Sequence, residues 1–208
     1  MSPATIADLW RTAHALADVA RPVTLASFRQ AELQADNKDA NGFDPVTVAD
    51  RATEAAIRST LAILRPQDAI LGEEGGAQPG TSGLTWVIDP IDGTRAYLSG
   101  TPTWGVLIGL ADDEGAILGI VDQPFIGERF IGGFGVSQYK GPLGNTGLTT
   151  RATASLAQSM LYTTFPEVGT ERDRLGFKAV ADQVQLVRYG MDCYAYALLA
   201  LGQIDLVV

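Results

Sequence analysis

Cysteine and histidine are almost missing from this sequence, which has one of each among its 208 residues. The single cysteine, Cys193, excludes an internal disulfide and a cysteine-rich zinc site, and such sparing use of cysteine is typical of a reducing compartment. Long apolar runs are also absent, since none approaches the roughly 20 residues of a membrane-spanning helix. The first residues lack the basic and apolar regions of a secretory signal. We therefore expect a cytoplasmic, globular protein.

Positive charge is scarce as well. The chain has 15 Lys and Arg against 24 Asp and Glu, a formal net charge of −9. This acidic balance argues against nucleic acid or an anionic membrane as a partner. A phosphorylated substrate would therefore have to be received by a bound cation or by local backbone amides.

Hydrophobic residues make up 46% of the chain, enough for a sizeable core. No repeat, low-complexity segment or linker divides it, so we expect a single unit over residues 1–208. Apolar periodicity predicts mixed α and β structure. The expected helices are 5–28, kinked or restarted at Pro22, then 47–65, 172–182 and 191–201; the expected strands are 69–71, 86–89, 104–110, 117–121, 130–135, 139–148, 161–164, 185–189 and 204–208.

The most informative stretch is Trp-Val-Ile-Asp-Pro-Ile-Asp-Gly-Thr at residues 86–94. Proline cannot donate to a sheet, so we expect the strand to end near Asp89, with Asp92 close to the same sheet edge. Gly93 allows backbone to approach a ligand closely, and Thr94 is a candidate cap for the following helix. Two carboxylates beside free backbone N–H groups predict a place for Mg²⁺ and a phosphate together.

Each acidic motif also has a purely structural interpretation. Asp89 and Asp92 are common residue types in turns, and a lone glutamate such as Glu73 in a glycine-rich loop usually faces solvent. Thr47 and Asp50 together have the spacing of a helix capping box. For Asp50, a capping role and a site role are compatible, because both place it at a helix N-terminus.

In this order, the motifs resemble the inositol monophosphatase-like family of metal-dependent phosphatases. They are Asp-Pro-Val-Thr-Val-Ala-Asp at 44–50, Leu-Gly-Glu-Glu at 71–74 and the stretch 86–94. The resemblance implies a layered αβαβα sandwich, usually dimeric. It also implies that two or more Mg²⁺ ions are bound by Glu73, Asp89, the Ile91 carbonyl and Asp92, and that the phosphate is held by Gly93 and Thr94. Catalysis, by orienting or activating water, would involve Asp50, Thr94 and Glu73. Lys38 would correspond to a mobile-loop lysine.

A second phosphatase signature, that of the haloacid-dehalogenase-like enzymes, also has an Asp pair before Gly-Thr. In that signature one residue separates the aspartates, usually near the N-terminus. Here two residues separate them, one of them a proline, and a helical segment comes first. We therefore reject that interpretation, together with the aspartyl-phosphate intermediate that it predicts.

The stretch Gly-Met-Asp-Cys-Tyr-Ala-Tyr at 190–196 resembles the histidinol-phosphatase branch of the family. Asp192 would then pair with the ammonium and imidazole of histidinol phosphate; the alternative is that it caps the following helix. We expect a phosphatase of histidine biosynthesis. The alternatives are an inositol-phosphate or other sugar-phosphate phosphatase, or a chain that only binds metal or ligand.

The last five residues, 204–208, have the composition of a core strand. In the resembling family, further elements follow this point, including a Trp-Asp or Tyr-Asp motif with another metal-bridging aspartate and an acidic residue that contacts substrate. We therefore expect a truncated chain with an exposed apolar edge near Leu206 to Val208. Alone, it would be poorly soluble and weakly active unless a partner covers that edge.

Overall fold

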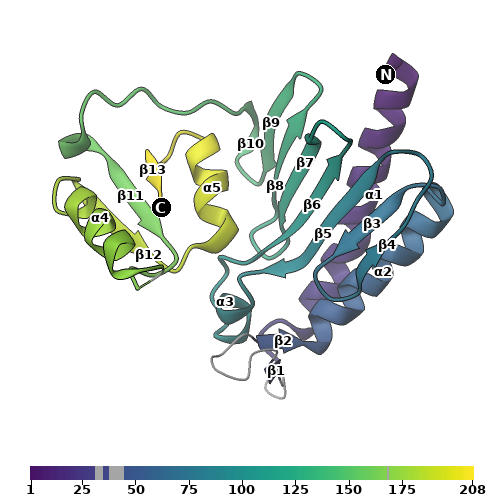
Figure 1. The fold of residues 1–208 in the computed structure, drawn as a ribbon, viewed down its shortest axis with the longest axis horizontal. Helices are drawn as coiled ribbons and strands as arrows, with labels where there is room; N and C mark the ends of the chain where they lie inside the picture. The colour runs from purple at the N-terminus through teal and green to yellow at the C-terminus, as the bar shows by residue number, and fades with distance from the viewer. Residues whose placement is uncertain (31–34, 38–44, 168) are drawn as a thin grey trace.

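A computed structural model describes residues 1–30, 35–37, 45–167 and 169–208. Helices and sheets alternate in five layers (Figure 1). Helices α1 and α2 cover one face of a large sheet, α5 lies on its other side, and a small sheet with α4 completes the stack. The structure thus confirms the predicted αβαβα arrangement.

The first layer consists of two long helices. Helix α1 spans Pro3–Ser27 and is capped by Ser2, whereas α2 spans Val48–Leu64 and begins at the predicted capping box. Helix α1 does not restart at Pro22, because it continues through this residue as one helix. A proline removes only one helical hydrogen bond, and the buried side chains of α1 continue across it at Ala20 and Thr24.

The large sheet contains eight strands in the order β10-β9-β8-β7-β6-β5-β3-β4. Only the β3–β5 pair is parallel. The predicted hairpin at 104–121 is the β6–β7 pair. One face of the sheet packs on α1 and α2 around a core that includes Leu16, Ile57 and Trp86. The strands are β3 (Ala69–Gly72), β4 (Gly76–Gln78), β5 (Thr85–Asp92), β6 (Gly105–Ala111), β7 (Ala116–Gln123), β8 (Glu128–Gly133), β9 (Val136–Gly141) and β10 (Gly144–Gly147).

Strand β5 differs from the expectation in length, because it does not end near Asp89. It continues through Pro90 to Asp92, and its register against β6 shifts between the two aspartates. Such an irregularity is where a strand tolerates a proline. The bulge keeps both carboxylates at the end of one central strand.

The small sheet contains three parallel strands in the order β12-β11-β13. Between the two sheets, α5 packs on the large sheet through Ala197 and Tyr194 against Phe130 and Tyr139. The remaining elements, in chain order, are β1 (Ala35–Asn37), β2 (Pro45–Thr47), α3 (Thr94–Leu98), the 3-10 helix η1 (Leu156–Gln158), β11 (Met160–Thr163), α4 (Glu171–Ala181), β12 (Leu186–Tyr189), α5 (Asp192–Ala200) and β13 (Leu206–Val207).

Two apolar surfaces are open. A cleft of about 830 Å³ lies beside α5 over the large sheet, where Val87, Leu107 and Val121 are among its lining residues. Strand β13 pairs with β11 on one side and forms an edge of the small sheet, and Val208 is 61% exposed. The predicted exposed edge is therefore present. Within the part of the chain that the structure describes, no helix is both long and apolar enough to cross a membrane.

Candidate active site

A pocket of about 260 Å³ opens where β5 ends, and residues far apart in the sequence meet there. The β3–β4 turn, the end of β5, the start of α3, the segment after β11 and the start of α5 all contribute to it. Nearly all of the predicted site residues line this pocket. Its lining residues are Glu73, Asp89, Ile91, Asp92, Gly93, Thr94, Arg95, Thr164, Phe165 and Asp192.

Three carboxylates dominate the pocket. The pKa of Asp89 is raised because the group is buried and because Glu73 and Asp92 place negative charge beside it. A hydrogen bond with Glu73 also raises this pKa, whereas the Ile91 N–H, 3.1 Å from Asp89 Oδ1, opposes the shift. The free site therefore concentrates negative charge that a cation would neutralise.

The side chains of this pocket determine whether it can hold a metal ion. Among the residues with described positions, no three His, Cys, Asp or Glu side chains stand close enough to hold an ion as they lie. Glu73, Asp89 and Asp92 nevertheless bring hard oxygen donors into one pocket, and their mutual repulsion is what a divalent cation relieves. The chemistry of this donor set fits a divalent cation.

Helix α5 begins directly against the aspartate pair. The backbone N–H of Cys193 donates to Asp92 Oδ2 at 2.6 Å, which ties this helix to the end of β5. Cys193 itself is buried, and burial raises the pKa of its thiol.

Asp192 is the first residue of α5 and does not cap it. The N-cap is Met191, which makes no side-chain cap bond, so the capping alternative is wrong. Asp192 has a left-handed φ of 45°, and a Cβ placed on Gly93 would lie 2.8 Å from its Oδ2. The Asp192 side chain therefore lies directly over the Gly93 turn, with its carboxylate in the pocket. Burial first, and then the charge of Asp92, raises the pKa of Asp192 to about 6, while Arg95 opposes the rise.

The turn after β5 is built around Gly93. It adopts a left-handed φ of 86° and serves as the N-cap of α3, so Thr94 is the first helical residue rather than the cap that we expected. The Thr94 hydroxyl donates instead to the Ile91 carbonyl at 3.2 Å. The Thr94 hydroxyl, which we predicted to bind phosphate, thus contacts the Ile91 carbonyl, which we predicted to bind metal.

Asp50 lies beside the pocket rather than in its lining. Its Oδ2 accepts from the Thr47 N–H at 2.8 Å and from the Thr47 hydroxyl at 2.5 Å, which completes the capping box of α2. Burial raises its pKa, opposed by the hydrogen bonds with Thr47, and the charge of Glu73 adds to the rise. The structure confirms that Asp50 caps α2, as expected. Its role in orienting water stays a prediction. Lys38 lies outside the described residues.

Glu54 is a residue that sequence reasoning missed. It is 2% exposed, and its two carboxylate oxygens accept from the backbone N–H groups of Glu74 at 2.7 Å and Gly75 at 2.8 Å. Arg58 donates to it at 2.7 Å, and a Cβ on Gly72 would lie 2.2 Å from it. Glu54 therefore holds the loop that carries Glu73. The sequence offered one signal for this role: Glu54 lies one helical turn after Asp50, on the apolar face of α2, where a charged residue is unexpected.

We expect Glu54→Gln to weaken Mg²⁺ binding by about 10- to 100-fold, the usual effect of losing a group that orients a ligand. The amide NH₂ of glutamine can accept no hydrogen bond, so one loop N–H would lose its acceptor. Calorimetric titration with Mg²⁺ measures the effect, and Glu114→Gln in the exposed β6–β7 turn is the matched control. Equal Mg²⁺ affinity in both variants would contradict the positioning role.

Arg95, Thr164 and Phe165 also line the pocket without having been predicted. Arg95 directly follows the Asp-Gly-Thr motif, so its position was a usable signal. Thr164 and Phe165 come from the small sheet, more than 60 residues away in sequence from that motif. Nothing in the sequence pattern placed them here.

Comparisons with known proteins agree with this geometry. A profile of the inositol monophosphatase family matches residues 6–208. The bifunctional phosphatase IMPL2, chloroplastic, of Arabidopsis thaliana is 40% identical over 197 residues, which cover 94% of this chain and 55% of that protein. The histidinol-phosphatase of Streptomyces coelicolor is 36% identical over 213 residues, which cover 96% of this chain and 76% of that protein.

Among solved structures, an inositol monophosphatase from Zymomonas mobilis superposes with a TM-score of 0.82 at 37% identity. The match covers all of this chain and 78% of that one. The chain thus spans about half to three quarters of the length of these relatives. It belongs to the inositol monophosphatase family, whose members are metal-dependent phosphoric monoester hydrolases.

Proposed function

We propose that this protein hydrolyses a phosphate monoester with Mg²⁺, and that its preferred substrate is L-histidinol phosphate. The observation that carries the proposal is one pocket lined by Glu73, Asp89 and Asp92, by the Gly93–Thr94 turn and by Asp192. Carboxylates that need a cation thereby stand beside a turn that can receive a phosphate. That combination is what Mg²⁺-assisted phosphoryl transfer to water requires.

In this proposal Glu73, Asp89, the Ile91 carbonyl and Asp92 would hold two or more Mg²⁺ ions. When bound, such ions lower the pKa of a coordinated water and neutralise charge on the leaving oxygen. Gly93 and Thr94 receive the phosphate because the glycine turn leaves room for close approach. Asp50 and Thr94 orient the attacking water, and Cys193 fixes Asp92 through its backbone N–H.

Asp192 supports the choice of substrate. Its carboxylate belongs to the pocket that would hold the phosphate, so a leaving group that carries an ammonium finds a counter-charge there. A neutral polyol gains much less from it. Relatives that bear the name histidinol-phosphatase, from Streptomyces coelicolor and Mycobacterium tuberculosis, match 96% and 92% of the chain.

The decisive experiment compares kcat/KM for L-histidinol phosphate and myo-inositol 1-phosphate in the presence of Mg²⁺. We expect a clear preference for histidinol phosphate. The second candidate substrate is inositol phosphate, which is favoured by the 37% identity to the Zymomonas mobilis inositol monophosphatase. A preference for inositol phosphate would establish that alternative.

Asp192→Asn should lower kcat/KM for histidinol phosphate by about 10- to 100-fold, because a hydrogen bond to a charged group contributes about 1.5–3 kcal/mol. The amide keeps the size of the side chain but loses its charge. Hydrolysis of inositol phosphate should fall much less. Steady-state kinetics on both substrates measure the ratio, and an equal loss on both would show that Asp192 has no part in recognising charge.

A chain that binds ligand without turnover is the remaining alternative. Calorimetry separates it from the enzyme. For the enzyme we expect at least one bound Mg²⁺ that strengthens phosphate binding, whereas for a pure scaffold we expect neither the bound cation nor the enhancement. We also propose that the protein is a homodimer, as the family resemblance implies, and that it is cytoplasmic, as its sparing use of cysteine favours. Sedimentation velocity tests the oligomeric state.

A further inference from the structure

The pocket contains a cation stacked on an aromatic ring. The guanidinium carbon of Arg95 lies 5.6 Å from the centroid of the Phe165 ring, and both residues line the pocket. Phe165 is 38% exposed, so the ring is open to the pocket rather than part of a core. The charge of Arg95 also acts on Asp192 across the same space. A resident cation thus lies on an aromatic face in the same pocket as a carboxylate.

The backbone holds the ring and the carboxylate in a fixed relation. The Gly190 N–H donates to the carbonyls of Thr163, at 3.1 Å, and Thr164, at 2.9 Å, and these residues immediately precede Phe165. The Gly190 carbonyl in turn accepts from the Thr103 hydroxyl at 3.2 Å. Since Gly190 lies two residues before Asp192, the ring and the carboxylate are anchored through one short segment.

We propose that the face of the Phe165 ring binds the planar cationic ring of the leaving group, and that the Arg95 guanidinium occupies this face when no substrate is bound. The inference rests on the proposed function, which it deepens by assigning a specificity-determining residue. Guanidinium and imidazolium are both flat, delocalised cations, and both are attracted to the face of an aromatic ring. An imidazolium of the substrate could therefore replace the Arg95 guanidinium on the Phe165 ring without any further binding surface.

This arrangement divides the recognition of the leaving group between two residues. Asp192 would pair with the ammonium, while Phe165 would stack on the heterocycle. A neutral polyol offers a cation to neither and would have to displace Arg95 without compensation. Selectivity would therefore come from replacing one stacked cation by another.

The test compares the specificity ratio, kcat/KM for histidinol phosphate over that for glycerol 2-phosphate, in Phe165→Leu, Phe165→Trp and the parent chain. We expect Phe165→Leu to lower this ratio about tenfold and Phe165→Trp to keep it, because tryptophan is the best ring for a stacked cation. Phe125→Leu is the matched control. Arg29 stacks on Phe125 at 4.5 Å, and neither residue lines the pocket, so its ratio should not change.

Arg95→Gln tests the resident cation. Histidinol, the phosphate-free alcohol, should bind this variant several-fold more tightly than the parent chain in calorimetry with Mg²⁺, because the ring face is no longer occupied. Unchanged or weaker binding would overturn the exchange. Equal loss of the ratio in Phe165→Leu and Phe165→Trp, or an unchanged ratio in Phe165→Leu, would overturn the role of the ring.

Failure of the proposed function looks different. In that case the parent chain would either hydrolyse no phosphate monoester, so that the kinetic ratio would not exist, or prefer inositol phosphate to histidinol phosphate. Calorimetric binding of histidinol to the parent chain and to Phe165→Leu would still decide the role of the ring. Binding weakened about tenfold by the substitution supports the role, and equal binding contradicts it.

Discussion

Replacing Asp89 by asparagine should reduce turnover at least about a thousandfold while the protein stays folded. The residue stands between Glu73 and Asp92 in the pocket, and their charges act on it directly. An amide at this position removes a negative donor from the proposed metal site. A divalent cation contributes several kcal/mol to transition-state stabilisation, and about 4 kcal/mol corresponds to about a thousandfold in rate. Phosphate release under saturating Mg²⁺ measures the loss, and circular dichroism checks the fold.

The same substitution should make the metal-free protein more stable. Burial and the neighbouring carboxylates raise the pKa of Asp89 above its usual value, so the folded state favours the protonated form. The contribution of Asp89 to the free energy of unfolding is therefore present at low pH and is lost as pH rises through this raised pKa. Asparagine stays neutral and avoids the loss. We expect the melting temperature without metal, at neutral pH and above, to rise by about 2–4 °C for each kcal/mol of relieved repulsion.

Asp113→Asn, in the exposed β6–β7 turn, is the matched control for both effects. It removes the same charge from a position outside the pocket and should change neither turnover nor melting temperature appreciably. Normal turnover in Asp89→Asn would contradict the site assignment. A melting temperature that stays level or falls without metal would show that the carboxylates do not repel one another in the folded protein.

Local chemistry explains why so much of the acidic site was predictable. The Asp-Pro-Ile-Asp-Gly-Thr stretch carries its own strand end, its own turn and two pocket carboxylates within a few residues. The capping box of Thr47 and Asp50 is likewise a short-range pattern, and the structure contains it. Glu73 was assigned to the site through the family resemblance, because a lone glutamate in a glycine-rich turn usually faces solvent. In each of these motifs, neighbouring residues in the sequence fix the local conformation.

The residues that the sequence did not reveal depend on contacts between distant segments. Glu54 has its role because Gly72 lets α2 approach β3, which no helical periodicity shows. Phe165 reaches the pocket because β11 and β12 pair and Gly190 anchors the end of β11. The continuation of β5 to Asp92 likewise depends on its pairing with β6. The roles of such residues depend on tertiary contacts, which cannot be predicted from the secondary-structure propensity of a single sequence.

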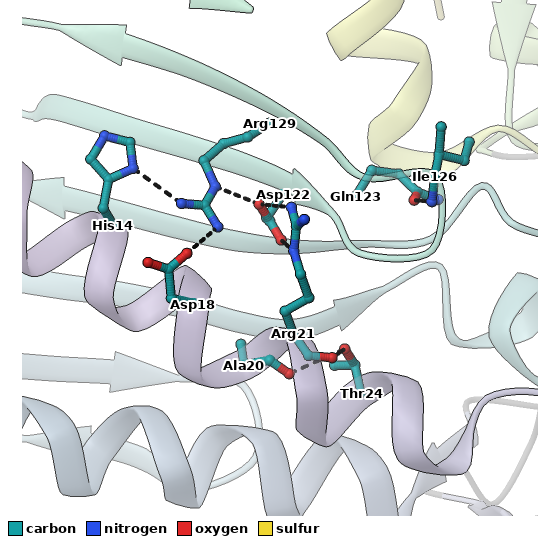
Figure 2. A network of polar contacts seen from close by, with 9 residues as sticks. All are labelled: His14, Asp18, Ala20, Arg21, Thr24, Asp122, Gln123, Ile126 and Arg129. Carbon is teal, nitrogen blue, oxygen red and sulfur yellow. Dashed lines mark hydrogen bonds and ion pairs between the residues drawn. The ribbon is translucent and has the colours of Figure 1, made fainter. Parts of the chain in front are cut away.

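A second large effect is expected at Asp122 in β7, which is not among the residues that line the pocket. This carboxylate is fully buried and accepts from two arginines (Figure 2). Arg21 of α1 donates from Nη2 to Oδ1 at 2.8 Å and from Nε to Oδ2 at 3.1 Å, and Arg129 of β8 donates from Nε to Oδ1 at 2.5 Å. Arg129 also reaches Asp18 at 2.8 Å and His14 at 3.2 Å. The network joins α1 to the large sheet.

Asp122→Ala should lower the free energy of unfolding by about 3–5 kcal/mol, because it leaves two arginines beside a buried site without their common counter-charge. Chemical denaturation measures this loss. Asp18→Ala is the matched control, since Asp18 pairs with the same Arg129 but its side chain is 69% exposed. An exposed pair contributes only about 0–1 kcal/mol, so this variant should remain close to the parent chain. Equal stability losses in the two variants would mean that burial of Asp122 does not set the strength of the network. The low exposure of the Arg129 side chain, 12%, argues against that result, because Arg129 cannot simply turn to solvent when Asp122 is removed.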